Sequence, residues 1–206
     1  MRIYAVVGGI AAGKSTVSRL LARRGGVVVD ADRLGHRALR IPRVVEELSR
    51  RFGADTVGAD GKVDRRVLGE RVFGRPARLR QLNAIVHPEI ARLLRQRLAT
   101  LERRRVACAI LDAALFLDVD LGVAVDAVVV VTAPRAVRRQ RLRSRDALTD
   151  AECEARLSSQ PRLGVWTRQA DFRIDTQGSP AQVEARVNRL WPQLQRFRGR
   201  RRTGGS

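Results

Sequence analysis

Short apolar runs alternate with longer stretches of helical pattern along this chain. The apolar runs cover residues 3–7, 27–29, 106–111, 127–132 and 172–174. Continuous Val, Leu, Ile and Ala runs of this length indicate strands buried on both faces, and strands that alternate with helices form parallel sheets. The pattern predicts a three-layer α/β fold with a parallel five-stranded sheet.

Two helical excursions interrupt this alternation. Residues 34–104 are too long for a simple crossover, and we expect an inserted subdomain with a long helix that begins at Arg75-Pro76 and is interrupted at His87-Pro88. The second excursion, residues 141–170, contains a capping box from Thr149 to Glu152. The other parts, residues 1–33, 105–140 and 171–195, form the core of one domain, and we expect the basic tail 196–206 to be frayed.

The segment after the first apolar run reads Gly-Gly-Ile-Ala-Ala-Gly-Lys-Ser and matches the phosphate-binding loop pattern G-x-x-x-x-G-K-[ST]. Its glycines would let the backbone bend and bring N–H groups against phosphate oxygens, at the positive end of a helix. Lys14 would reach the β/γ-phosphates and Ser15 would ligate Mg²⁺. The alternative is a glycine-rich strand–helix turn without a ligand. The expected ATP-binding residues are Gly8, Gly9, Ala11, Ala12, Gly13, Lys14, Ser15 and Thr16.

Two carboxylates follow the second predicted strand, Asp30 and Asp32. Open α/β sheets bind ligands at the carboxyl ends of their strands, and residues two apart on an extended segment point to the same side. One carboxylate would deprotonate an acceptor hydroxyl, and the other would organise the acceptor or Mg²⁺ and its waters. The alternative for Asp32 is an N-cap of the helix that follows.

Charge and cysteine content narrow the classes of function. The net charge is +20, and only two of the 41 basic residues are lysines, one of them Lys14. Aromatic residues make up 4% and do not interleave with the basic ones, so we expect a phosphate-rich ligand and weak polyanion binding at low salt, without a specific nucleic-acid site. Cys108 and Cys153 have no metal-binding spacing. With no leader or membrane-length apolar segment, a reducing cytoplasm fits best.

Further motifs narrow the class of phosphate-binding protein that the sequence predicts. They are the Asp-Ala-Asp of residues 30–32, Asn83-Ala-Ile-Val-His-Pro-Glu-Ile90, and Ala170-Asp-Phe-Arg-Ile-Asp175 followed by Gly178-Ser179. Together with the phosphate-binding loop, they resemble the dephospho-CoA kinase family in order from residue 2 to residue 190. The resemblance implies transfer of the ATP γ-phosphate to the 3′-hydroxyl of dephospho-CoA, the last step of coenzyme A synthesis. It also implies a helical acceptor-binding insertion and a helical lid.

The resemblance assigns roles to individual residues. Asp32 is the implied base for the ribose hydroxyl, and Asp30 and Asp112 support Mg²⁺ and its waters, with Asp112 following an apolar strand as a Walker-B carboxylate does. Arg141 and Arg145 match the family's lid arginines, which would neutralise charge on the transferring phosphoryl group. The alternative for both arginines is a solvated helix face.

His87, a substrate-binding candidate, is expected to shape the acceptor subdomain through a hydrogen bond and not to act as a base. The chain departs from the family pattern at several positions. In the acceptor motif, Ala114 and Asp118 stand where the family has a proline and a glutamate. In the lid, Gln160 is kept and Trp166 replaces a lysine. Arg162 or Arg168 would offset the missing positive charge. The residues that differ from the family pattern are Ala114, Asp118, Thr132, Trp166 and Thr176.

Two other functions stay open on the sequence alone. One is a different small-molecule kinase, such as a nucleotide kinase. The other is a non-catalytic protein that binds ATP or nucleic acid. A GTPase is disfavoured because the chain has no N-K-x-D guanine motif. For the oligomeric state, which the sequence does not fix, a monomer is favoured.

Overall fold

The computed structural model describes residues 1–72, 74–114, 116, 118–158, 163–199 and 201–204. These residues form two compact units. The first, here called the sheet unit, consists of Met1–Asp30 with Leu98–Ser206, and the second, the helical unit, consists of Ala31–Arg97. The helical unit covers most of the insertion expected at residues 34–104.

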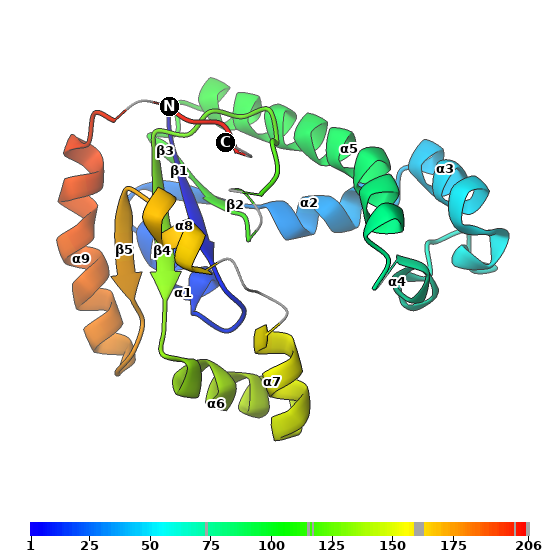
Figure 1. The fold of residues 1–206 in the computed structure, drawn as a ribbon. Helices are drawn as coiled ribbons and strands as arrows, with labels where there is room; N and C mark the ends of the chain where they lie inside the picture. The colour runs from blue at the N-terminus through cyan, green and yellow to red at the C-terminus, as the bar shows by residue number, and fades with distance from the viewer. Residues whose placement is uncertain (73, 115, 117, 159–162, 200, 205–206) are drawn as a thin grey trace. The chain divides into compact units, whose positions relative to one another are not determined.

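Within the described residues, the sheet unit contains a five-stranded sheet in the order β2-β3-β1-β4-β5 (Figure 1). All four strand pairs are parallel, which confirms the predicted sheet. The strands are β1 (Arg2–Gly8), β2 (Gly26–Asp30), β3 (Cys108–Asp112), β4 (Ala127–Thr132) and β5 (Phe172–Asp175). Each lies within two residues of the range predicted for it.

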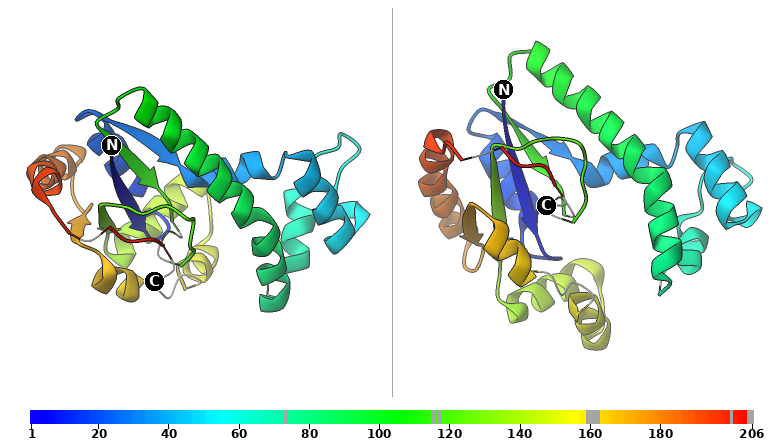
Figure 2. Two further views of the ribbon diagram at one scale, coloured as in Figure 1. Left: turned by 90° about the horizontal axis from the view of Figure 1, so that it is seen from above. Right: turned by 45° about the horizontal axis from the view of Figure 1, so that its top comes forward.

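Helices connect the strands, and helices also build the insertion. In the described residues they are α1 (Lys14–Ala22), α2 (Ala31–Ala38), α3 (Pro42–Phe52), the 3₁₀ turn η1 (Ala54–Thr56), α4 (Arg65–Val72), α5 (Pro76–Arg103), α6 (Arg135–Asp146), α7 (Asp150–Ser158), α8 (Leu163–Gln169) and α9 (Pro180–Arg196). Helices α1 and α9 pack on one face of the sheet, and α8 contacts β1 and β4. In both figures α9 runs beside the edge strand β5 (Figures 1 and 2).

The central strands are buried on both faces. All residues of β3 and β4 are buried, and so is β1 from Ile3 onward. Tyr4 and Val6 pack in one apolar cluster with α1 and α9, so the alternate residues Ala5 and Val7 face the other layer. This double burial explains why these strands are continuous apolar runs.

The helical unit has its own apolar cluster, which contains residues of α3, α4 and α5 such as Leu48, Leu68 and Val86. Helix α5 continues through Pro88, so the predicted interruption at His87-Pro88 is wrong. A proline removes one helical hydrogen bond, and burial of Val86 and Ala91 on either side of it favours the continued helix.

The prediction that the whole tail 196–206 is frayed is wrong for part of it. Residue 196 ends α9. Beyond it, Arg202 exchanges backbone hydrogen bonds of 2.8 and 3.0 Å with Val125, and its guanidinium pairs with Asp171. These partners are distant in sequence, so local composition does not reveal them. In the part of the chain that the structure describes, no helix is long and apolar enough to cross a membrane.

Candidate active site

The segment from β1 to α1 forms a tight loop at the carboxyl edge of the sheet. Gly13 precedes α1 with a φ of 88°, and Ala11 has a φ of 56°, so the left-handed positions are Ala11 and Gly13. Gly8 still lies in β1, where an added Cβ would stand 2.7 Å from the carbonyl oxygen of Val131. The bend predicted at three glycines is therefore made by Ala11 and Gly13, whereas Gly8 permits close strand packing.

Lys14, Asp112 and Asp30 belong to adjacent elements of the same edge. The Lys14 ammonium forms an ion pair with the carboxylate of Asp112, and both side chains are largely buried. Asp112 ends β3 and stands opposite Asp30 in the parallel register with β2. The structure thus places a cation and two carboxylates where the loop meets the strand ends, as expected for residues that handle phosphate and a metal ion.

The donor atoms at this edge fit a hard divalent cation. Ser15 is exposed in the first turn of α1 and carries a hydroxyl, while Asp112 and Asp30 carry carboxylates. Among the described residues, no group of three or more His, Cys, Asp or Glu side chains forms a metal cage. Mg²⁺ needs none, because it is commonly held by one or two protein oxygens together with phosphates and water.

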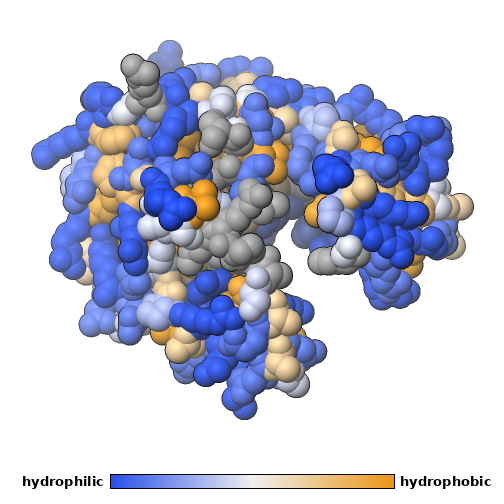
Figure 3. Space-filling view, viewed as in Figure 1, coloured by the Kyte–Doolittle hydropathy of each residue, from blue (hydrophilic) through white to orange (hydrophobic). Residues whose placement is uncertain are grey.

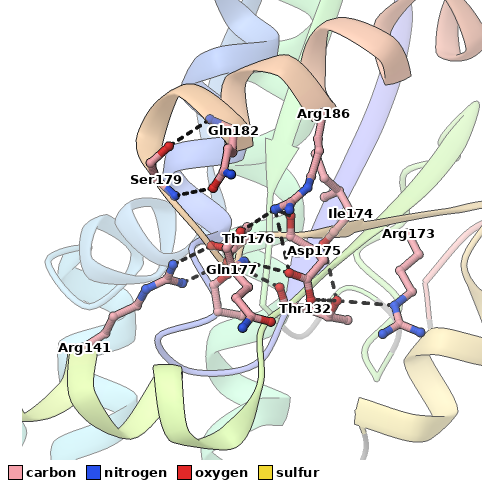
Figure 4. Close-up of polar contacts among 11 residues, drawn as sticks. Thr132, Arg141, Arg173, Ile174, Asp175, Thr176, Gln177, Ser179, Gln182 and Arg186 are labelled. Carbon is pink, nitrogen blue, oxygen red and sulfur yellow. Dashed lines mark hydrogen bonds and ion pairs between the residues drawn. The ribbon is translucent and has the colours of Figure 1, made fainter.

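Arg141 binds a backbone carbonyl of the phosphate-binding loop and the segment after β5. From α6 its guanidinium points toward the segment after β5, where it donates to the hydroxyl (2.9 Å) and the carbonyl (2.7 Å) of Thr176 (Figure 4). It also lies 3.3 Å from the carbonyl oxygen of Ala11. The Thr176 hydroxyl in turn donates to the carbonyl of Ala12 at 2.7 Å. Thr176, one of the departures from the family pattern, thus connects the loop to α6.

Arg145 lies one turn further along α6 and makes different contacts. Its guanidinium donates to both carboxylate oxygens of Asp146, at 2.7 and 2.9 Å, and this pairing raises the pKa of Arg145 and lowers that of Asp146. The side chain is 62% exposed. To bind a phosphoryl group, the Arg145 guanidinium would have to give up its hydrogen bonds to Asp146.

The predicted capping box of the second excursion is confirmed. The Thr149 amide donates to the Glu152 carboxylate at 2.9 Å, and the Glu152 amide donates to the Thr149 hydroxyl at 3.3 Å. The bond from the Thr149 amide lowers the pKa of Glu152. The bond from the Glu152 amide satisfies a donor at the start of α7 that has no partner within the helix.

Asp32 and His87 belong to the helical unit. Asp32 is exposed in the first turn of α2, which begins at Ala31, so its predicted alternative as an N-cap is wrong. For the same reason the segment from Asp30 to Asp32 is not extended, and the spacing argument for a shared side does not apply. His87 is half-buried in α5, and burial lowers its pKa, which favours the neutral imidazole. A neutral imidazole fits a hydrogen-bonding role.

Two departures from the family pattern contact each other. Trp166 is buried in α8, and its indole N–H donates to the carboxylate of Asp118 at 3.2 Å. The Trp166 side chain is therefore packed inside the sheet unit. Arg168 is exposed on α8. Gln160 and Arg162, which were expected to contribute to the lid, lie outside the described residues.

Sequence reasoning missed the contact that Arg138 makes. Its guanidinium donates to the carbonyl of Ile10 at 2.8 Å, and the residue is 6% exposed. Arg138 was only one of a series of arginines on α6, and no local signal separates it from Arg139, which is exposed. Only the structure shows that Arg138 lies on the buried side of α6, one turn before the buried Leu142.

A strand order of β2-β3-β1-β4-β5, a phosphate-binding loop after β1 and a helical insertion define a P-loop kinase fold. A family model described as dephospho-CoA kinase matches residues 2–182. The chain therefore belongs to the dephospho-CoA kinase family.

Individual relatives agree with this. A dephospho-CoA kinase of Anaeromyxobacter dehalogenans is 42% identical over 202 residues, which cover 98% of this chain and 96% of that one. One of Geobacter sulfurreducens is 38% identical over 93% of this chain and 98% of its own length. The crystal structure of TT1252 from Thermus thermophilus matches with a TM-score of 0.78 at 33% identity, over 94% of this chain and 97% of that chain.

Proposed function

We propose that this chain transfers the γ-phosphoryl group of ATP to the 3′-hydroxyl of dephospho-CoA and so completes coenzyme A. The observation that supports it best is the pairing of Lys14 with the buried Asp112 directly beside a phosphate-binding loop, in a chain of this family. Lys14 would exchange Asp112 for the β/γ-phosphates, and the amides of the loop would bind the remaining phosphate oxygens.

Asp32 is our candidate for the base. Its carboxylate would accept the proton of the 3′-hydroxyl as the oxygen attacks the γ-phosphorus, and the bond to the β-phosphate oxygen would break to release ADP. Asp32 is exposed, as a group that must reach a substrate has to be. Asp30 and His87 would bind or orient the acceptor, His87 as a neutral hydrogen-bonding partner.

Ser15 and Asp112 would hold Mg²⁺, with Asp30 in support. Their hydroxyl and carboxylate oxygens are the ligands that this ion prefers. Bound there, Mg²⁺ would neutralise charge on the β- and γ-phosphates. Arg145 would add positive charge at the transferring group. Arg141 is the less favoured candidate for that role, because its guanidinium is held by Thr176 and Ala11.

The cytoplasm, the monomeric state and the absence of a specific nucleic-acid partner stay predictions. Hydrophilic residues cover most of the face seen in Figure 3, as expected for a chain with 30% charged residues. A background of positive charge predicts duplex DNA binding that is lost between about 50 and 200 mM salt.

The decisive experiment is a phosphorylation assay with the purified chain, ATP, Mg²⁺ and one acceptor at a time. We expect coenzyme A to form from dephospho-CoA, detected by chromatography and mass, with adenosine and nucleoside monophosphates used at least about 100-fold less efficiently. The proposal is wrong if dephospho-CoA is inert while one of the other acceptors is turned over.

A further inference from the structure

Three consecutive carbonyl groups of the phosphate-binding loop are bound from outside the loop. Each accepts a hydrogen bond from a side chain of a segment that follows β4 or β5 in the sheet unit. The pairs are Ile10 with Arg138 (2.8 Å), Ala11 with Arg141 (3.3 Å) and Ala12 with Thr176 (2.7 Å).

These bonds bear on the amides that face the ligand. A peptide group is planar and trans, so its C=O and the N–H of the next residue point in opposite directions. A donor that holds the carbonyl of Ile10 on the outside therefore aims the amide of Ala11 inward, and Thr176 does the same for the amide of Gly13 through Ala12. Ala11 and Gly13 are the two left-handed residues of the loop, and successive amides in such a conformation form an anion-binding concavity.

Of the three donors, Arg138 is the one whose charged side chain is buried, and burying a charge costs free energy. It is 6% exposed, and its Nη2 atom is buried without a hydrogen-bond partner among the residues that the structure describes. Burial and the neighbouring Arg135 lower its pKa, which reflects the cost of keeping this guanidinium charged. A buried arginine of this kind destabilises the protein unless something compensates for it, and an anion bound at the loop would do so.

The loop also packs against α6 and α7. Ile10 and Ala11 contact the small apolar cluster of Leu142, Cys153 and Leu157. Arg138 is one turn before Leu142 on α6, so the same helix supplies both the apolar contact and the hydrogen bond. The loop is therefore attached to α6 and α7 by apolar contacts and by the hydrogen bond from Arg138.

We propose that Arg138 is a positioning residue for the nucleotide: it holds the carbonyl of Ile10 outward so that the loop amides are ready for phosphate, and its charge favours a bound polyphosphate. The inference rests on ATP binding at this loop and not on the identity of the acceptor. Arg138 does not itself touch the reacting atoms.

The test compares Arg138→Met, Arg138→Lys and the control Arg139→Met. Methionine keeps the length and apolar packing of the side chain but removes its charge and donors. Arg139 is the adjacent, exposed arginine, 3.9 Å from Glu154. ATP affinity is measured by calorimetry without acceptor, and KM for ATP, KM for dephospho-CoA and kcat are measured at saturating partner concentrations.

For Arg138→Met we expect Kd and KM for ATP to rise about 10-fold, while KM for dephospho-CoA and kcat stay within about 3-fold. Arg138→Lys keeps the charge and should lie between Arg138→Met and the parent. Arg139→Met should match the parent. A merely structural role would lower the melting temperature without this split between ATP and acceptor.

Three results would overturn the inference: parental ATP affinity in a folded Arg138→Met, an equal rise of both KM values, or the same loss in Arg139→Met. If Arg138→Met does not fold, parental ATP affinity in Arg138→Lys overturns it. Calorimetry needs no turnover, so failure to phosphorylate dephospho-CoA would reject the proposed function and leave the result for Arg138 readable.

Discussion

Charged residues around the phosphate-binding loop of the sheet unit make different contacts from most of those in the helical unit. Around the phosphate-binding loop, Lys14 pairs with a buried carboxylate and Arg138 binds a backbone carbonyl while almost fully buried. In the helical unit many ion pairs join exposed side chains, such as Arg66 and Glu70, which are 74% and 63% exposed. Water screens the second kind of pair, so its loss has little effect. In the buried contacts around the loop, water cannot take the place of a partner that is removed.

The contrast shows that residue type does not indicate which cation matters. The chain has 41 basic residues, and their importance follows from what each one contacts and how deeply it is buried. If the comparison is right, substitutions near the loop change catalysis strongly, and matched substitutions of exposed residues do not. Asp32 and Glu89 are the informative exceptions within the helical unit.

The largest effect is expected for Lys14→Ala. It removes the ammonium that would bind the β/γ-phosphates and leaves the buried Asp112 carboxylate without that partner, so kcat/KM should fall at least about 10³-fold. The chain offers a matched control in its other lysine. Lys62 is 67% exposed and pairs with Asp60 in a turn, and Lys62→Ala should keep parental kinetics. Equal losses in both variants would remove the distinction between the two units.

Asp32→Asn tests whether an exposed residue of the helical unit takes part in catalysis. The amide has the shape of the carboxylate but cannot accept the hydroxyl proton, so kcat should fall about 100-fold or more while Kd for ATP stays within about 2-fold. Steady-state kinetics and calorimetry measure the two quantities. Glu70→Gln, an exposed carboxylate of the same unit, is the control. Turnover close to the parent rate in Asp32→Asn would reject it as the base.

Arg145→Ala tests an exposed arginine within the sheet unit. If Arg145 stabilises the transferring phosphoryl group, kcat should fall about 10-fold and KM for ATP should change by less than about 3-fold. Arg143 is two residues away on α6 and 70% exposed, and its substitution by alanine should leave kcat unchanged. Identical kinetics for the two variants would mean that Arg145 belongs to a solvated helix face.

Much of the sheet unit could be predicted because its signals are local. Strands buried on both faces are unbroken apolar runs, and the loop between β1 and α1 follows a fixed spacing. The capping box at Thr149 depends on two residues three apart. Each of these features is complete within about ten residues, so a single sequence is enough to find it.

The errors arise where distant residues decide the structure. Pro88 stays inside α5 because the flanking turns are buried, and Arg202 is held by Val125 and Asp171. The contact of Arg138 with Ile10 joins residues 128 positions apart, and the contact of Trp166 with Asp118 joins residues 48 apart. No local pattern encodes such pairs. The roles of Asp32, His87 and Arg145 came from the family resemblance and stay predictions.

The smallest expected effect is a difference in the free energy of unfolding between two variants of the helical unit, one at a buried and one at an exposed carboxylate–arginine contact. Glu89 is 7% exposed and accepts from Arg43 and Arg92, whereas the pair of Arg66 and Glu70 is exposed. Glu89→Gln keeps the shape and one acceptor but removes the charge, so the free energy of unfolding should fall by about 1 kcal/mol. Arg66→Ala should cost no more than about 0.5 kcal/mol. Urea unfolding with a shared slope measures both, and a larger loss in Arg66→Ala would show that burial does not decide the weight of a charged contact in this chain.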